Sequence, residues 1–227
     1  MTNGSEVPNV KPPISPAGPP LVHRLAAESR LYRVGLKIHE PSSFNPQPAD
    51  RDYGGGRFDG TDDDPYSYMY VGDCQEVAIC ETFLRDLAPE PNGNRAVPLV
   101  RVVGRKLSIL RNRRALNLVD LSVGRGLGAY SQDTWLTTTT SPQYAFTRHW
   151  AHWIRAVTHK NIDGFRWRSF REPLGTAMIL FGDRLVVPED IDSATDAEQP
   201  LYGDFDTAIG HAFLSDILAE YGAFLGP

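Results

Sequence analysis

The chain has 227 residues and a formal net charge of −5, and 41% of its residues are hydrophobic, 22% charged and 10% aromatic. This composition is typical of a globular protein long enough to bury one sizeable core, and the acidic balance argues against a protein built mainly to bind nucleic acid. No apolar run approaches the roughly 18 residues that span a bilayer, the N-terminus lacks the apolar region of a signal peptide, and 2 cysteines cannot form a disulfide framework, so we expect a cytoplasmic protein without a membrane segment.

The first twenty residues are rich in proline and hold almost no large apolar side chains. Such a segment cannot bury enough surface to offset the entropy that is lost on ordering. We therefore predict a disordered or extended arm over residues 1–20. Because no second linker of this composition follows, we predict one folded domain over residues 21–227.

Apolar, β-leaning runs predict a series of strands along the domain. They lie at Leu31–Val34, Tyr66–Val71, Val97–Val103, Lys106–Leu110, Leu116–Leu121, Ala177–Phe181 and Leu185–Val187. In the second of these runs the tyrosines alternate along the chain and therefore share one face. Residues 39–65 have no periodic pattern, and a loop of that length inside a compact domain is usually functional or mobile.

Helical periodicity predicts three helices. The first covers residues 73–87 and begins with a capping-box pattern, Asp73 followed by Glu76. The second begins at Ser141-Pro142 and runs to about residue 158, and the third covers residues 206–221 and ends at Gly222. Strands and helices interleave without a steady βαβ alternation, so we predict the α+β class, with a mixed sheet and flanking helices, rather than a Rossmann fold.

A carboxylate lies within the apolar stripe of the first predicted helix. The stripe consists of Val77, Cys80, Leu84 and Leu87, and Glu81 lies four positions after the first of them and three before the third. Burying an unpaired carboxylate is costly. Glu81 therefore either reaches solvent at the edge of the stripe or is a site carboxylate with a positive or polar partner.

Two upstream arginines are candidate partners for this carboxylate. Arg33 lies at the end of a predicted strand, and Arg57 lies in the loop Gly54-Gly55-Gly56-Arg57-Phe58. The glycine run is consistent with a flexible turn, but glycines also let backbone N–H groups approach a phosphate, and arginine suits bidentate phosphate contacts. Neither a P-loop nor a Rossmann site fits, because the chain has no Walker lysine and no strand–GxGxxG–helix arrangement.

Two further polar side chains have two interpretations each. Tyr70 is consistent with core packing or with stacking on a flat heteroaromatic ligand. Ser169 follows the stretch Asp163-Gly164-Phe165-Arg166-Trp167-Arg168, and no G-x-S-x-G elbow marks it as a nucleophile. His149 and His152 lie three apart on the second helix, but without an HExxH pattern, so we expect packing or surface histidines and no metal site.

Taken in order, these motifs resemble those of the RES domain family, which is named for its Arg, Glu and Ser. The motifs are Leu31-Tyr32-Arg33, Gly55-Gly56-Arg57-Phe58, Tyr70 through Glu81, Asp163-Gly164 up to Ser169, and Leu180-Phe181. The resemblance covers roughly residues 31–185, and its sharpest part runs from Tyr70 to Glu81. It implies a single domain with the fold of the ADP-ribosyltransferases. It also implies an enzyme that depletes NAD by hydrolysis or phosphorolysis, as do many members that are toxins of toxin–antitoxin pairs.

The same resemblance implies that Arg33, Arg57, Tyr70, Glu81 and Ser169 line an NAD site. Glu81 would stabilise the positive charge of the oxocarbenium-like state that forms when the nicotinamide–ribose bond breaks. Arg33 and Arg57 would hold the phosphates, and Tyr70 would stack on or orient the nicotinamide. Ser169 would hydrogen-bond Glu81 or the ribose. NAD is then a substrate and no cofactor is implied, and the acceptor is water, inorganic phosphate or a protein side chain.

The chain departs from the family pattern in three segments. The Asp-rich 39–65 loop is longer than the family usually has, and the proline-rich arm and the segment after about residue 188, with a helix at about 204–222, look like additions. They leave open the identity of a cognate antitoxin protein.

Two rival functions stand beside NAD cleavage: transfer of ADP-ribose to a macromolecule, and a catalytically silent module that binds a nucleotide or a partner protein. The oligomeric state cannot be read from the sequence.

Overall fold

The computed structural model describes residues 11–227, except for the side chain of Lys160. The first ten residues of the arm predicted over residues 1–20 lie outside the described residues. Residues 11–20 form neither a helix nor a strand, and the backbone amides of Ala17 and Gly18 donate to the carbonyl of Ala129, 2.9 and 3.2 Å away. This part of the chain therefore lies against the end of α2 (Gly124–Gly128).

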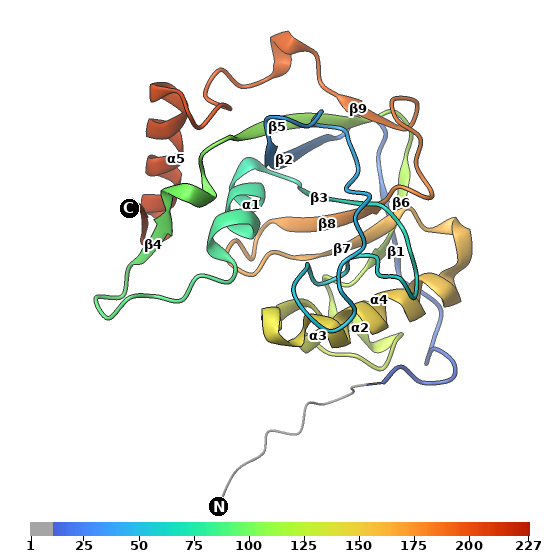
Figure 1. The fold of residues 1–227 in the computed structure, drawn as a ribbon. Helices are drawn as coiled ribbons and strands as arrows, with labels where there is room; N and C mark the ends of the chain where they lie inside the picture. The colour runs from blue at the N-terminus through green and yellow to red at the C-terminus, as the bar shows by residue number, and fades with distance from the viewer. Residues whose placement is uncertain (1–10) are drawn as a thin grey trace, which may run out of the picture.

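An eight-stranded mixed sheet forms the centre of the described residues (Figure 1). Its strands are, in chain order, β1 (Val22–Leu25), β2 (Arg30–Leu36), β3 (Tyr68–Gly72), β5 (Arg105–Asn112), β6 (Leu116–Asp120), β7 (Gly164–Arg168), β8 (Thr176–Phe181) and β9 (Ile191–Ser193). In space they follow the order β1-β6-β7-β8-β3-β2-β5-β9, and all neighbours are antiparallel except β6 and β7. A separate small sheet pairs β4 (Arg95–Pro98) with β10 (Ala223–Gly226) in parallel.

The helices pack against the sheet in two groups (Figure 1). The remaining helices are α1 (Gln75–Ile79), α3 (Trp135–Thr138), α4 (Tyr144–Thr158) and α5 (Ala208–Glu220). α4 packs on the half of the sheet that contains β7 and β8 and buries an aromatic-rich cluster with it, including Trp150 and Phe181. α1 packs over β2 and β3, and α5 and the small sheet enclose a second cluster beside it, including Phe83 and Leu218. No helix within residues 11–227 has the length and apolarity that crossing a membrane requires.

The predicted α+β class, with a mixed sheet and flanking helices, is confirmed. Two of the predicted strands are wrong in part or in whole. β4 ends at Pro98, which has no amide for further pairing, and residues 99–101 form a 3-10 turn instead of continuing the strand to Val103. Leu185–Val187 is not a strand, because Val186 and Val187 are exposed in an irregular segment and have no strand to pair with.

The helix predicted over residues 73–87 is present but is shorter and is not α-helical throughout. It consists of α1 and a π-helical turn, Cys80–Leu84. The predicted capping box is wrong, because Asp73 Oδ1 accepts a hydrogen bond from the amide of Thr176 on β8, 2.9 Å away, and Cys74 takes the N-cap position. Turns of π-helix frequently occur at functional sites, and this one begins one residue before Glu81.

Candidate active site

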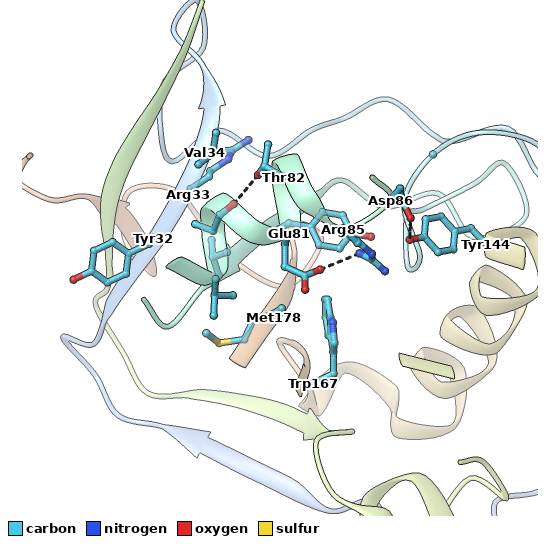
Figure 2. Close-up of a pocket in the computed structure, with 17 residues that line it drawn as sticks. Tyr32, Arg33, Val34, Glu81, Thr82, Arg85, Asp86, Tyr144, Trp167 and Met178 are labelled. Carbon is cyan, nitrogen blue, oxygen red and sulfur yellow. Dashed lines mark hydrogen bonds and ion pairs between the residues drawn. The ribbon is translucent and has the colours of Figure 1, made fainter. Parts of the chain in front are cut away.

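A cavity of about 240 Å³ lies between α1 and the start of α4, where the two helical groups meet (Figure 2). Its floor comes from β2, β3, β7 and β8, and its sides come from α1, the π-helical turn and the loop at Gly55-Gly56. The lining contains three of the residues expected from the sequence, Arg33, Tyr70 and Glu81. The structure thus brings together residues that are far apart in the chain, from Tyr32 to Met178.

Glu81 is held in one orientation by the turn that joins β7 to β8. Its Oε1 accepts hydrogen bonds from the hydroxyl of Ser169, 2.8 Å away, and from the amide of Phe170, 3.0 Å away. Its Oε2 forms an ion pair with Nη1 of Arg85 at 3.2 Å, and its side chain is 15% exposed. The carboxylate is therefore neither solvated nor unpaired, and Ser169, which is buried and does not line the cavity, acts on it from behind.

Arg85 is a member of the site that sequence reasoning missed. It lies one helical turn after Glu81, lines the cavity, and places its guanidinium 5.0 Å from the centre of the Tyr144 ring. Its Nε and Nη2 are buried and have no hydrogen-bond partner among the described residues. The i, i+4 spacing of a glutamate and an arginine could have identified the pair.

Arg33 borders the cavity in the middle of β2, and its side chain alternates with those of Tyr32 and Val34, which pack toward α1. Its Nη1 donates to the carbonyls of Pro41 and Ser43, both 2.6 Å away. Burial lowers the pKa of Arg33 to about 10, and no carboxylate forms an ion pair with it within the part of the chain that the structure describes. A cation that is partly desolvated without a counter-ion favours the binding of an anion.

Arg57 does not line the cavity. Its buried guanidinium donates to the carbonyls of Leu136 and Thr139, 2.9 and 2.8 Å away, and so joins the glycine loop to the end of α3. Burial and the nearby charge of Arg85 lower the pKa of Arg57 to about 9. The structure therefore places Arg57 behind the wall of the site, with both of its terminal nitrogens occupied by backbone carbonyls.

Tyr70 joins the glycine loop to the sheet. Its hydroxyl donates to Oδ1 of Asp59 at 2.7 Å and accepts from the amide of Phe58 at 3.0 Å, while the amide of Gly56 donates to the other oxygen of Asp59 at 2.6 Å. Burial raises the pKa of Tyr70, so the hydroxyl keeps its proton. The polar end of this side chain is occupied, and only its ring is available to the cavity.

Trp167 and Met178 complete the apolar part of the lining. Trp167 lies on β7 opposite Ala177 of β8, and its ring is 6.2 Å from the Tyr70 ring in an edge-to-face arrangement. Figure 2 shows Trp167 beside the Glu81–Arg85 pair. Sequence reasoning missed Trp167 because it did not identify β7 as a strand, although apolar and arginine residues alternate from Phe165 to Arg168. Met178 lies within the predicted strand Ala177–Phe181 and was not singled out there.

No cluster of three or more histidine, cysteine, aspartate or glutamate side chains that could hold a metal ion occurs within residues 11–227. His149 and His152 both lie on α4, and the His152 ring packs edge-to-face on Tyr66, 6.2 Å between the centres. Neither histidine lines the cavity.

Comparisons with known proteins agree with this architecture. Residues 30–200 match the family model of the RES domain. Among solved structures, the chain is similar to a chain in the crystal structure of the M. tuberculosis MbcT-MbcA toxin–antitoxin complex, with a TM-score of 0.50 and 10% sequence identity over 76% of this chain and 84% of that chain. At this identity the likeness concerns the fold. No match was found among curated protein sequences.

Proposed function

The chain belongs to the RES domain family, and from this premise we propose that it cleaves NAD at the bond between nicotinamide and ribose. One observation carries the proposal. Glu81 is a carboxylate held by two donors on Oε1, and it faces a cavity that is also lined by Arg85 and by aromatic residues, among them Tyr70 and Trp167. A fixed negative charge beside an apolar wall suits a reaction whose transition state gains positive charge on a sugar.

The chemistry requires little more than this carboxylate. The bond between the nicotinamide nitrogen and ribose C1′ breaks, and its electron pair neutralises the positive charge of the nicotinamide ring. Because nicotinamide leaves as a neutral base, no general acid is needed. Glu81 stabilises the oxocarbenium-like ribose until an acceptor oxygen forms the new bond to C1′.

The lining supports a division of the cavity between the parts of the substrate. The rings of Tyr70 and Trp167 would pack against the nicotinamide, and Arg33 and Arg85 would contact the phosphates. Arg57 would act indirectly, through the wall that it holds and the charge that it places behind Glu81. At about 240 Å³ the cavity is below the roughly 300–1,000 Å³ of sites that enclose a whole ligand, so the adenosine end of NAD would remain outside.

The test is NAD consumption by the purified protein, with Glu81→Gln beside Glu76→Gln as a matched change on α1. We expect wild type and Glu76→Gln to release nicotinamide, and Glu81→Gln to lower kcat by about 10²- to 10³-fold, because the stabilising charge is lost.

Repeating the assay with inorganic phosphate identifies the acceptor, because phosphorolysis gives a phosphorylated ADP-ribose and hydrolysis gives ADP-ribose. Transfer of radiolabel from NAD to a macromolecule identifies the rival reaction. Intact NAD with folded wild-type protein would refute the proposal.

A toxin role extends the proposal to the cell. It is supported by membership of the RES domain family and by the shared fold with a chain of a toxin–antitoxin complex. We expect expression of the wild-type chain to arrest growth, Glu81→Gln to relieve the arrest, and a cognate antitoxin to bind over the cavity. Equal growth with and without the active protein would contradict this role and leave the enzymatic proposal standing.

A further inference from the structure

We infer that Tyr221, at the end of α5, is a positioning residue for Glu81: its hydrogen bond to Glu172 fixes the turn that orients the carboxylate. Tyr221 lies beyond the RES match, which ends at residue 200. A segment outside the matched domain would therefore complete the site. The kinetic part of this inference rests on the proposed function.

The first step is the turn itself. Both donors to Oε1 of Glu81 come from two consecutive residues, Ser169 and Phe170, at the start of the turn between β7 and β8. Neither donor belongs to the helical segment that carries Glu81. The orientation of the carboxylate therefore depends on where residues 169–175 lie relative to the π-helical turn.

The second step is how the turn is held. Its ends are joined by the bond from the Ser169 amide to the Gly175 carbonyl at 3.2 Å, and the Gly175 amide donates to the Glu172 carbonyl at 2.9 Å. Arg171 ties it to the end of the π-helical turn by donating to the Leu84 carbonyl at 3.1 Å. These bonds involve the backbone of the turn and the Arg171 side chain, and they leave the Glu172 carboxylate available to another element.

The third step is the anchor from α5. The Tyr221 hydroxyl donates to Oε2 of Glu172 at 2.6 Å, joining residues 49 positions apart in the chain. Burial and the Glu172 carboxylate raise the pKa of Tyr221, so the hydroxyl stays protonated and remains a donor. A short bond to an ionised acceptor is stronger than one between neutral groups. Gly222 follows with a positive φ of 62° and turns the chain into β10, which fixes Tyr221 at the helix end.

The consequence is a chain of contacts from Tyr221 at the end of α5 to the Glu81 carboxylate. Tyr221 holds Glu172, Glu172 belongs to the turn, and the turn donates twice to Glu81. Loss of the first contact leaves the cavity lining intact, because neither Tyr221 nor Glu172 lines it. Substrate binding should therefore survive while the alignment of the carboxylate suffers, and a small misalignment of a catalytic group lowers the rate strongly.

The experiment compares Tyr221→Phe with Tyr202→Phe in the full chain. Tyr202 is the matched control, because its hydroxyl also makes one hydrogen bond, to Gln75 at 3.0 Å, and its ring packs on Phe213 of α5. We expect Tyr221→Phe to lower kcat for NAD cleavage about tenfold with KM changed less than about twofold, and Tyr202→Phe to leave both near wild type. Glu172→Ala should match Tyr221→Phe, and the double variant should be no worse than either single change.

A second readout needs no NAD. Hydrogen exchange of the peptide covering residues 169–175 should accelerate in Tyr221→Phe and Glu172→Ala, and not in Tyr202→Phe. Unchanged exchange in that peptide, or faster exchange with an unchanged kcat, would overturn the inference. If the wild-type protein does not cleave NAD at all, the proposed function fails, and the exchange measurement alone then decides whether Tyr221 holds the turn.

Discussion

Arg57 is the residue whose observed place differs most from the role that the family resemblance implies. Its guanidinium is occupied by the carbonyls of Leu136 and Thr139 and does not line the cavity, so we expect it to stabilise the fold around the site rather than to contact a ligand. A buried cation with two carbonyl acceptors is difficult to replace, because an ammonium group does not reproduce the planar fork of a guanidinium.

Arg57→Lys should therefore lower the free energy of unfolding by about 2–4 kcal/mol, because at least one buried carbonyl loses its donor. Urea unfolding monitored by tryptophan fluorescence measures this. Arg51→Lys in the same loop is the control, since Arg51 is exposed and its nearest carboxylate is 3.7 Å away. A raised KM for NAD with unchanged stability would instead indicate that Arg57 contacts the substrate.

At the scale of single residues, much of the site could be predicted, and for identifiable reasons. Glu81 stands out because it interrupts an apolar stripe, and Arg33, Tyr70 and Ser169 followed from the family motifs in the same order. The orientation of Arg57 could not be predicted, because the glycine loop has no periodicity to fix a side-chain direction. Arg85 could have been predicted, because its spacing of four residues from Glu81 is visible in the sequence.

The glycine loop shows how an element supports the site. A Cβ added at Gly56 would lie 2.5 Å from Oδ1 of Asp59 and 2.8 Å from the Tyr70 hydroxyl, whereas one at Gly54 would meet nothing within 4 Å. Alanine at Gly56 therefore tests the effect of steric crowding, and alanine at Gly54 tests the effect of backbone strain. Gly54 has a positive φ of 57°, so alanine there costs only the strain of a left-handed conformation.

Gly56→Ala should break the Asp59–Tyr70 bond, move one wall of the cavity, and lower kcat/KM for NAD about tenfold or more. Gly54→Ala should lose about 1 kcal/mol of stability through strain and keep kcat/KM near wild type. Steady-state kinetics and urea unfolding of both variants test this. Equal kinetics for the two variants would mean that the loop is not a wall of the site.

α4 carries a pH-dependent contribution to stability through His152. Burial lowers the pKa of this histidine below its ordinary value, against the opposing effect of Asp64. The unfolded chain therefore binds the proton more readily than the folded protein, so stability is retained above about pH 6.5 and falls as the pH drops toward the lower, folded-state pKa.

Urea unfolding at pH 7.5 and 5.5 should therefore show a loss of stability in the wild type that is smaller in His152→Gln. His211→Gln, which changes an exposed histidine on α5, should keep the wild-type difference. Equal losses in all three proteins would assign the acid sensitivity to other groups.

At the scale of elements, the sequence predicts that a helix or strand is present better than it predicts where its regular geometry changes. α4 and α5 follow from periodicity, but the π-helical turn does not, because an inserted residue leaves most of the apolar stripe in place. β7 was missed although its residues alternate with period 2, since Arg166 and Arg168 gave it a polar appearance.

At the scale of the whole molecule, α5 covers one of the hydrophobic clusters of the core. Leu214 is fully buried against a cluster that includes Cys80, Phe83 and Leu84 of the π-helical turn. Because the site and the C-terminal helix share this cluster, we expect them to unfold together in one transition. The spatial order of the eight strands, by contrast, could not be predicted, since it depends on pairings between residues far apart in the chain.

Leu214→Ala should lower the free energy of unfolding by about 2–5 kcal/mol, because the cavity left behind cannot fully collapse. Leu201→Ala, at a position that is 91% exposed, should change it by less than about 0.5 kcal/mol. Denaturation followed in parallel by fluorescence and by NAD cleavage checks both the size of the loss and the single transition. Early loss of activity, ahead of fluorescence, would show that the site unfolds on its own.

The late position of α5 and β10 in the chain also has a consequence for biosynthesis. β10 pairs with β4, which lies 128 residues earlier in the chain (Ala223 opposite Arg95), and Tyr221 meets Glu172 only after α5 has formed. A nascent chain on the ribosome therefore cannot anchor the turn beneath Glu81, or complete the cluster that supports the cavity, until α5 has been synthesised. Under the proposed function, NAD cleavage would therefore stay low until synthesis has passed α5, which gives an inhibitor time to bind before full activity is reached.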